Sequence, residues 1–359
     1  MNGNTTVWLA ADTFFNTRSG IFRPLFKSIA SALPDYFSRS LLGLLLTLLV
    51  SSSAAFAQPI SRDTSFSTHS AYLKARKQHP EISIARPVVP KGVRSSSALT
   101  YCTLPGGRAL QLDVFYRPAK RQRPAVLIIH GGGWASGHRE QHWPLAQQLA
   151  GRGFVAITAE YRLSGEAPYP AAVQDLKTAL RWLRAHAHSY AIDTNRVAVW
   201  GFSAGGQLAA LLGTTSHDTL YAAGPCHRSH SSQVQAVVDA DGILAFLHPE
   251  SGEGDDRKSL SAATRWFGAP KTERPELWEQ ASPLRHVDIH TPPMLFLNSA
   301  VDRMHAGRDD LRQQLDSLGI YSEAHTFPNT PHSFVLFNPW FEPVLNYTVA
   351  FLNRVFGTR

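Results

Sequence analysis

The residues best suited to chemistry lie in two short glycine-rich stretches, GFSAG at 201–205 and HGGGW at 130–134. The first fits the pattern G-x-S-x-G between a strand-like apolar run and a helix-like run. There the glycines permit a sharp turn that exposes the Ser203 hydroxyl beside the N–H groups of the following helix. The alternative is an ordinary glycine-rich turn in which Ser203 caps the helix. The strand-turn-helix context favours a nucleophile.

A serine hydroxyl is a weak nucleophile unless a base accepts its proton and a third group orients that base. His332 lies in a loop between the last expected strand and the final expected helix, which is the position of such a base. Asp302 comes a few residues after the preceding strand, and we expect it to orient His332. Asp309 and Asp310 compete for that role, but they begin the next expected helix, where carboxylates often serve as caps.

The HGGGW stretch follows a buried strand-like run, and its glycines predict donors for a developing negative charge. Attack on an ester carbonyl creates an oxyanion that preorganised N–H groups must face. We expect these donors to be the N–H groups of Gly132, Gly133 and Ala204. A phosphate-binding loop requires other glycine patterns, which are absent from this stretch. We expect His130 to hold the loop, and Trp134 either lines a substrate pocket or packs in the interior.

These residues need a scaffold, and strand-like and helix-like segments alternate from about residue 98 to the end. Alternation of this kind predicts an α/β fold, with a mostly parallel central sheet and helices on both faces. Between about residues 247 and 285 the alternation stops, which predicts an insertion over the active site where specificity is set. The expected strands include Leu110–Tyr116, Ala125–Ile129, Phe154–Ala159 and Val197–Trp200.

The first 57 residues are typical of an export signal. The uncharged apolar run Leu41–Val50 follows a basic segment and precedes a small-residue site for cleavage after Ala57. The run is shorter than the roughly 18 residues that span a bilayer, so no stable membrane span is expected, although the segment could remain as an anchor. Residues 58–97 are polar and predict a leader, and residues 98–359 predict the catalytic domain.

Composition limits the partners and cofactors. The net charge is +8, but the basic residues are scattered, and no Lys/Arg run with interleaved aromatics predicts a nucleic-acid surface. An acidic substrate remains open. The histidines of residues 138, 142 and 227–232 lack further ligands at metal spacing, so no metal is expected. Asp239 and Asp241 flank a strand end and are interpreted as turn residues. Whether Cys102 and Cys226 pair stays open, as does the oligomeric state.

Taken together, HGGGW, GFSAGG, Asp302 and His332 resemble the α/β-hydrolase superfamily, specifically its hormone-sensitive-lipase-like and acetyl/feruloyl-esterase-like (BD-FAE-like) branches. The resemblance covers about residues 100–359. It implies a Ser203–Asp302–His332 triad, oxyanion donors at Gly132, Gly133 and Ala204, and no cofactor. The acid departs from the family's Gly-x-x-Asp turn, because Asn298-Ser299-Ala300-Val301 precedes Asp302.

The stretches DRMHAGRDD and HPESGEGDD further resemble bacterial secreted esterases that deacetylate plant cell-wall polysaccharides such as pectin or xylan. We therefore expect an exported serine ester hydrolase whose partner is a small-molecule or polysaccharide ester. The basic side chains beside the expected acid predict contacts to an acidic polysaccharide: Arg303, His305 and Arg308. Two alternatives remain: an arylformamidase, amidase or small-ester lipase on the same fold, and a non-catalytic binding module.

Overall fold

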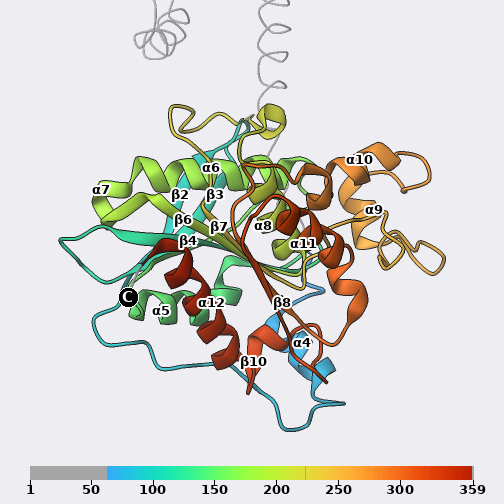
Figure 1. The fold of residues 1–359 in the computed structure, drawn as a ribbon, viewed down its shortest axis with the longest axis horizontal. Coiled ribbons are helices and arrows are strands. Elements are labelled where there is room, and N and C mark those ends of the chain that lie inside the picture. The colour runs from blue at the N-terminus through green and yellow to red at the C-terminus, as the bar shows by residue number, and fades with distance from the viewer. Residues whose placement is uncertain (1–62, 223, 358–359) are drawn as a thin grey trace, which may run out of the picture. The chain divides into compact units, whose positions relative to one another are not determined.

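A mixed β-sheet of eight strands forms the centre of the part that the structure describes (Figure 1). The computed structural model describes residues 63–222 and 224–357, within a compact unit that begins at Ile60. The strand order is β2-β3-β5-β4-β6-β7-β8-β9, in which β2 and β3 are antiparallel to their neighbours and the other pairs are parallel. The strands are β2 (Arg94–Thr103), β3 (Ala109–Tyr116), β4 (Arg123–Ile129), β5 (Val155–Ala159), β6 (Ile192–Phe202), β7 (Ala236–Ala240), β8 (Met294–Asn298) and β9 (Ser322–Thr326).

The parallel strands have continuous apolar sequences because helices cover both faces of the sheet. Side chains alternate between faces along a strand. In β4, Leu127 and Ile129 join the core beneath one helical layer, whereas Val126 and Ile128 join the core beneath the other. The first layer holds α6 (Ala171–Ala185), α8 (Ala204–Thr214) and α11 (Arg308–Ser317), and the second holds α5 (Trp143–Gly151) and α12 (Phe341–Phe356) (Figure 1). This arrangement is the α/β fold that the alternation predicts, and it has the α/β-hydrolase architecture that the resemblance implies.

Shorter elements complete the described residues. Among them are the helix α7 (Ala187–Tyr190) and the 3₁₀ helices η1 (Arg139–His142), η2 (Thr219–Tyr221), η3 (Pro283–His286), η4 (Asp302–His305) and η5 (Phe334–Leu336). Within residues 63–222 and 224–357, no helix combines the length and apolar character needed to cross a bilayer.

The predicted polar leader contains regular structure from residue 68 onward. Helix α4 (Thr68–Ala75) begins at a capping box in which Ser67 and Ser70 exchange hydrogen bonds. The short strand β1 (Ser83–Ile84) then pairs with β10 (Phe337–Asn338). Few apolar residues suffice for this docking, since Ala71, Ala75, Ile82 and Ala85 are the buried members. The predicted signal segment, residues 1–57, lies outside the described residues.

The predicted insertion lies between β7 and β8 and carries α9 (Ala262–Phe267) and α10 (Pro275–Gln280). Its aromatic side chains are buried against the core. The ring of Trp266 stacks on Trp134 of the HGGGW stretch, with 4.9 Å between ring centroids. Around this pair pack Phe246, Phe267, Trp278 and Tyr169. The aromatic cluster fixes the insertion to the loop that follows β4.

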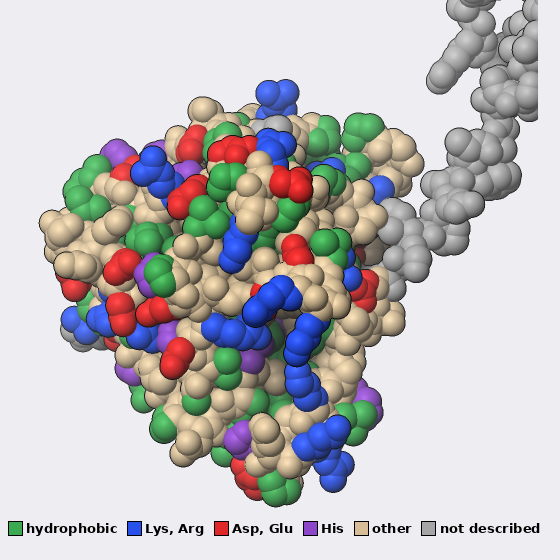
Figure 2. Space-filling view, turned by 90° about the vertical axis from the view of Figure 1, so that its right-hand side faces the viewer, with side chains coloured by type: hydrophobic (Ala, Val, Ile, Leu, Met, Phe, Trp, Pro, Cys, Tyr) green, Lys and Arg blue, Asp and Glu red, His purple; other side chains and the backbone are tan. Residues whose placement is uncertain are grey.

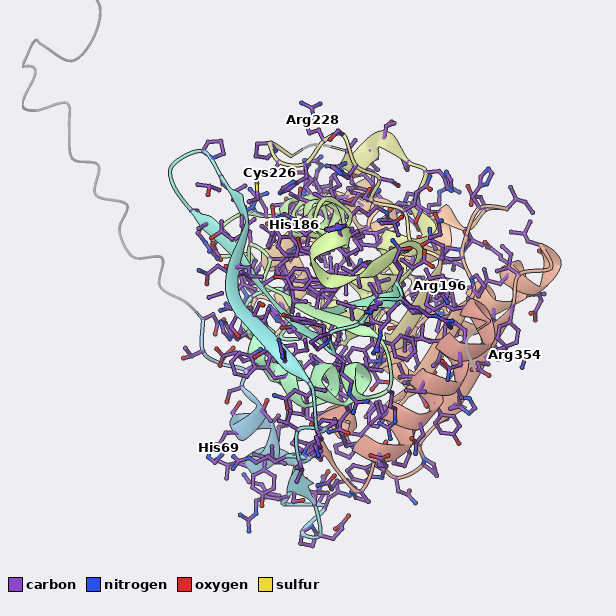
Figure 3. The ribbon with its side chains drawn as sticks, turned by 90° about the vertical axis from the view of Figure 1, so that its left-hand side faces the viewer. His69, His186, Arg196, Cys226, Arg228 and Arg354 are labelled. Atoms are coloured by element: carbon purple, nitrogen blue, oxygen red, sulfur yellow. A yellow bond between two sulfur atoms is a disulfide. The ribbon has the colours of Figure 1, made fainter. Side chains whose placement is uncertain are left out.

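A disulfide joins Cys102 of β2 to Cys226 in the segment that follows η2 (Figure 3). The two cysteines are 124 residues apart in the sequence, and their Cα atoms are 5.7 Å apart. The bond resolves the pairing that the sequence leaves open. It connects the edge strand of the sheet to a long surface segment on the α6 side.

The double substitution Cys102→Ser/Cys226→Ser is expected to lower the free energy of unfolding by about 2–5 kcal/mol, because the cross-link removes conformational freedom from the unfolded chain. Urea unfolding of wild type and variant measures the difference. Reductant should bring the wild type to the stability of the variant and leave the variant unchanged. Equal unfolding midpoints under oxidising conditions would contradict the prediction.

Candidate active site

Ser203 occupies a sharp turn between β6 and α8. Its backbone has φ 57° and ψ −122°, a conformation that non-glycine residues rarely adopt, and its N–H donates to the Ala240 carbonyl at 2.8 Å. The flanking glycines are required by space: a Cβ on Gly201 would overlap the Gly205 carbonyl, and one on Gly205 would overlap the Ile129 carbonyl. The turn leaves the Ser203 side chain half-buried at the carboxyl end of the sheet.

His332 meets Ser203 from the loop between β9 and η5. The Ser203 hydroxyl donates to His332 Nε2 at 2.8 Å, which is the contact that a nucleophile and its base require. The imidazole packs on Phe202, with 5.0 Å between ring centroids, and remains 28% exposed. The structure thus brings together the two residues that the sequence predicts as nucleophile and base.

The carboxylate on His332 is Asp241, not the predicted Asp302. His332 Nδ1 donates to Asp241 Oδ2 at 2.9 Å, and the other oxygen of this buried carboxylate accepts the Ser299 N–H at 2.7 Å. Asp302 lies in η4 with a side chain that is 98% exposed, and its ion-pair partner is His305 Nε2 at 3.9 Å. The competing Asp309 and Asp310 are also exposed, so the prediction of the acid was wrong.

Asp241 was missed because its sequence context is that of a turn. It lies directly after β7 and before a glycine, with φ 54°. The available signal was its position in the sheet. β7 is the hydrogen-bonded neighbour of β6, which carries Ser203, whereas β8, which precedes Asp302, is one strand further away. A carboxylate that ends β7 therefore needs less chain to reach a histidine above β6.

A second carboxyl group, Asp239, lies beneath this turn. It is fully buried, and its Oδ1 accepts the Gly242 N–H at 2.8 Å. Burial, together with the nearby Asp241 carboxylate, raises the pKa of Asp239 well above its usual value. The pair at the end of β7 thus divides into Asp239, which packs under α8, and Asp241, which faces His332.

The glycines of the HGGGW stretch lie against the nucleophile turn. A Cβ on Gly131 would come within 3.1 Å of Ser203 Cβ, so this close approach requires glycine. The Gly131 N–H is already used, because it donates to Gln141 Oε1 at 3.0 Å. The Gly132 carbonyl accepts from the Ser136 N–H and hydroxyl. Within the described residues, the N–H groups predicted as oxyanion donors have no hydrogen-bond acceptor: those of Gly132, Gly133 and Ala204.

Buried charges brace the segment that follows this loop. Asp113 Oδ2 accepts from Arg139 Nε at 2.8 Å and from Trp143 Nε1 at 2.9 Å, and Arg139 also pairs with Glu160. Asp113 is fully buried and Arg139 is 8% exposed. The network fixes η1, and η1 carries the Gln141 side chain that holds Gly131. The orientation of the glycine loop therefore depends on charges on β3 and at the end of β5, three and two strands away from β6, which carries Ser203.

The other predicted contact residues have different environments. Trp134 is 4% exposed, and its Nε1 donates to Gln207 Oε1 at 3.0 Å, so it packs beneath the insertion and offers little surface to a substrate. His305 is buried. The Arg308 guanidinium donates to Asn298 Oδ1 and pairs with Asp309. Of the predicted basic group, only Arg303 has a largely exposed side chain, at 55%.

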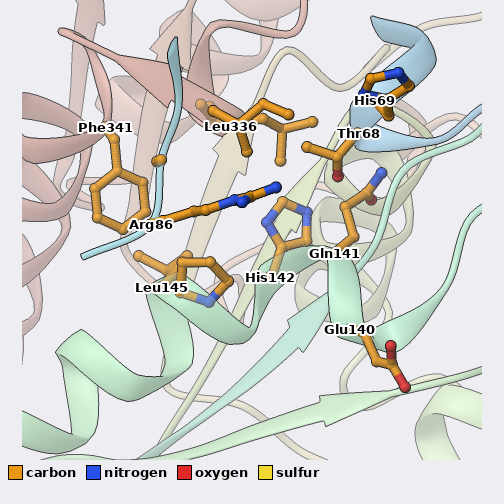
Figure 4. A pocket seen from close by; sticks show the side chains of 13 residues that line it. Thr68, His69, Arg86, Glu140, Gln141, His142, Leu145, Leu336 and Phe341 are labelled. Carbon is orange, nitrogen blue, oxygen red and sulfur yellow. The ribbon is translucent and has the colours of Figure 1, made fainter. Parts of the chain in front are cut away.

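A cavity of about 270 Å³ lies behind η1, between the leader and the start of α12 (Figure 4). Arg86 extends across it beside His142, and Gln141 and Phe341 also line it. Burial lowers the pKa of His142 to about 3, so this imidazole is neutral. Neither Ser203 nor His332 lines this cavity, which is therefore distinct from the catalytic cleft.

Comparison with known proteins agrees with this geometry. The family model named BD-FAE matches residues 112–307, which include the glycine loop, Ser203 and Asp241 and end before His332. The chain belongs to the BD-FAE family. The carboxylesterase NlhH of Mycobacterium tuberculosis is 38% identical over 236 residues, which cover 64% of this chain and 72% of that protein.

Two further proteins are similar to this chain. The probable carboxylic ester hydrolase LipM of M. tuberculosis is 30% identical over 246 residues. The propionate-bound structure of esterase 2 from Thermogutta terrifontis is 26% identical, covers 75% of this chain and 96% of that chain, and has a TM-score of 0.59. The matches span 54% of LipM and 63% of the M. tuberculosis esterase LipC, little more than half of these curated relatives.

For this BD-FAE family member, Asp241→Asn is expected to lower kcat by about 10³–10⁴-fold, because His332 loses the carboxylate that fixes its tautomer and stabilises its protonated form. Asp302→Asn, the matched control, should leave kcat unchanged. Steady-state hydrolysis of p-nitrophenyl acetate measures both variants. If the Asp302 variant loses activity and the Asp241 variant retains it, Asp302 of η4 is the acid that orients His332.

Gly132→Ala is expected to lower kcat by about 10²–10³-fold, since a Cβ there would overlap the Ser136 carbonyl and displace the N–H donors of the loop. Gly107→Ala is the matched control. Gly107 also has a positive φ, of 86°, but a Cβ there has no neighbour within 4 Å. Both rates are normalised to folded protein by circular dichroism. Equal losses in the two variants would show that backbone strain alone explains the effect.

Proposed function

We propose that this chain is a serine ester hydrolase that uses Ser203 as nucleophile, His332 as base and Asp241 as the acid that orients the base. The observation that carries the proposal is the continuous pair of hydrogen bonds, 2.8 Å from Ser203 Oγ to His332 Nε2 and 2.9 Å from His332 Nδ1 to Asp241 Oδ2. Relatives named carboxylesterase and carboxylic ester hydrolase support it.

The reaction begins when Ser203 Oγ attacks the acyl carbonyl carbon and His332 Nε2 accepts the hydroxyl proton. Buried Asp241 stabilises the resulting imidazolium. The carbonyl oxygen becomes an oxyanion, which the N–H groups of Gly132, Gly133 and Ala204 bind. As the intermediate collapses, His332 returns the proton to the departing alcohol and an acyl-serine remains. Water then repeats the sequence, with His332 as its base, and releases the acid.

The substrate class we propose is an acetylated plant cell-wall polysaccharide, pectin or xylan. The support is the sequence resemblance to secreted deacetylating esterases together with the insertion, whose Ala262 contacts Gly133 of the glycine loop. Export is part of the proposal. The signal-like segment 1–57 supports it, as does the Cys102–Cys226 disulfide, because disulfides persist mainly in oxidising compartments. A binding module on this fold, the competing class, has no need of a hydrogen-bonded nucleophile and base.

Ser203→Ala is expected to lower kcat for p-nitrophenyl acetate by at least about 10⁴-fold, because no other group is placed to attack the carbonyl. A fluorophosphonate probe should label wild type at Ser203 and leave the variant unlabelled. A screen of acetylated xylan, acetylated pectin, feruloylated arabinoxylan and simple acyl esters then ranks substrates. Full hydrolysis by the variant would exclude the mechanism, and an unlabelled, inactive wild type would favour the binding module.

A further inference from the structure

We call the insertion, residues 247–285, the roof, and it contacts the surroundings of the candidate active site at two places. At one end Ala262 of α9 contacts the oxyanion loop, since a Cβ on Gly133 would lie 3.0 Å from Ala262 Cβ. At the other end the 251–254 segment lies on η4, where a Cβ on Gly252 would lie 3.1 Å from Arg303 Cδ. The residues between these two contacts, 253–261, therefore connect the neighbourhood of the oxyanion loop to that of η4.

Glu253 is a carboxylate of the insertion that lies close enough to His332 for their charges to interact. The Lys271 ammonium donates to the Glu253 carbonyl at 2.9 Å, which fixes its backbone. The side chain is 15% exposed, and its ion pair is a long one, 3.5 Å from Glu253 Oε1 to Arg303 Nη1. Among the described residues, the Glu253 carboxylate accepts no hydrogen bond at closer range.

The segment that carries Arg303, residues 299–303, also positions the triad. Ser299, four residues before Arg303, donates to Asp241, and the Ala300 N–H donates to Thr330 Oγ1, two residues before His332. Burial raises the pKa of the Glu253 carboxyl, although the nearby charges of Arg303, His332 and Lys271 act in the opposite direction. A half-buried carboxyl group beside the base thus has unused acceptor capacity.

The charge of the insertion differs from that of the whole chain. Residues 247–285 contain seven acidic and six basic side chains, although the net charge of the chain is +8. Exposed arginines of the insertion are neutralised locally, Arg257 by Asp255 and Arg274 by Glu276. Figure 2, which views the side of α9 and α10, shows acidic and basic side chains mixed over the upper part of this face and a run of Lys and Arg side chains through its middle and lower part. The roof offers no uniformly positive surface to a polyanion.

We propose that Glu253 is a specificity-determining residue that accepts hydrogen bonds from the hydroxyl groups of a neutral sugar and repels an anionic one. The inference rests on the proposed esterase function and narrows its substrate class to neutral acetylated polyols, such as acetylated xylan, over acetylated pectin. Arg303 partners Glu253 when the cleft is empty. A sugar hydroxyl supplies the short donor that this pair lacks, whereas a uronate places a second carboxylate beside Glu253.

The test compares wild type, Glu253→Gln and Glu279→Gln. The control residue, exposed on α10, changes the charge of the insertion by the same amount. For Glu253→Gln, kcat/KM for an acetylated xylooligosaccharide should fall about 5–10-fold, chiefly through KM, because a hydrogen bond to a charged acceptor is lost. For an acetylated oligogalacturonide it should rise. Both values are divided by kcat/KM for p-nitrophenyl acetate, which has no hydroxyl group to bind and therefore reports any effect of the substitution on the triad itself. The control should match wild type on all three substrates.

If Glu253→Gln changes kcat/KM equally on all three substrates, Glu253 has a purely structural role. If Glu279→Gln has the same effect as Glu253→Gln, the long-range charge of the insertion explains the preference. Either result overturns the inference. If wild type hydrolyses p-nitrophenyl acetate but neither oligosaccharide, the proposed polysaccharide substrate fails independently. Glu253 is then judged on acetylcholine and acetylsalicylate, two acetyl esters of opposite charge. Its substitution must lower the ratio of cationic to anionic kcat/KM, and an unchanged ratio overturns the inference.

Discussion

The interaction on which the site depends is the hydrogen bond from His332 to the buried Asp241 carboxylate. A neutral imidazole accepts the serine proton at Nε2 only if its own proton resides on Nδ1, and a fixed acceptor on that side enforces this tautomer. Asp241 is fixed because the Ser299 N–H holds its second oxygen and the first turn of α8 packs against the residue that follows it. Three adjacent parallel strands, β6, β7 and β8, thereby contribute to one proton path.

That path requires close packing of backbone on backbone at the carboxyl edge of the sheet. Gly131, Gly201, Gly205 and Gly242 all lie where a Cβ would meet a neighbouring chain segment. The approach of the β4 loop to Ser203 follows from this packing. Because Trp134 stacks on Trp266, the same loop also carries the insertion. The loop and the insertion are therefore in contact through the stack of Trp134 on Trp266 and through Gly133 and Ala262.

Much of this arrangement follows from local sequence. Continuous apolar runs identify β4, β5 and β6, because a strand that is buried on both faces has apolar side chains at nearly every position. G-x-S-x-G identifies Ser203, because a strand-turn-helix with no room for side chains requires those glycines. The polar sequence of β2 conceals an edge strand, and the leader docks through few apolar residues, so neither has a strong periodic signal. Asp241 escaped for another reason: its function depends on which strands are neighbours, and strand order is a property of the whole fold.

Because the acid follows β7, the segment after β8 has a different role from the one that the sequence resemblance implies. Asp302 occupies the segment after β8 where the resemblance places the acid, yet this segment instead forms η4, whose Arg303 pairs with the insertion. Once the carboxylate at the end of β7 orients His332, the segment after β8 is no longer needed for proton transfer. It is then available to contact whatever the roof admits. With the acid one strand earlier, the segment after β8 no longer supplies the catalytic carboxylate, and its Arg303 instead ties η4 to the insertion through Glu253.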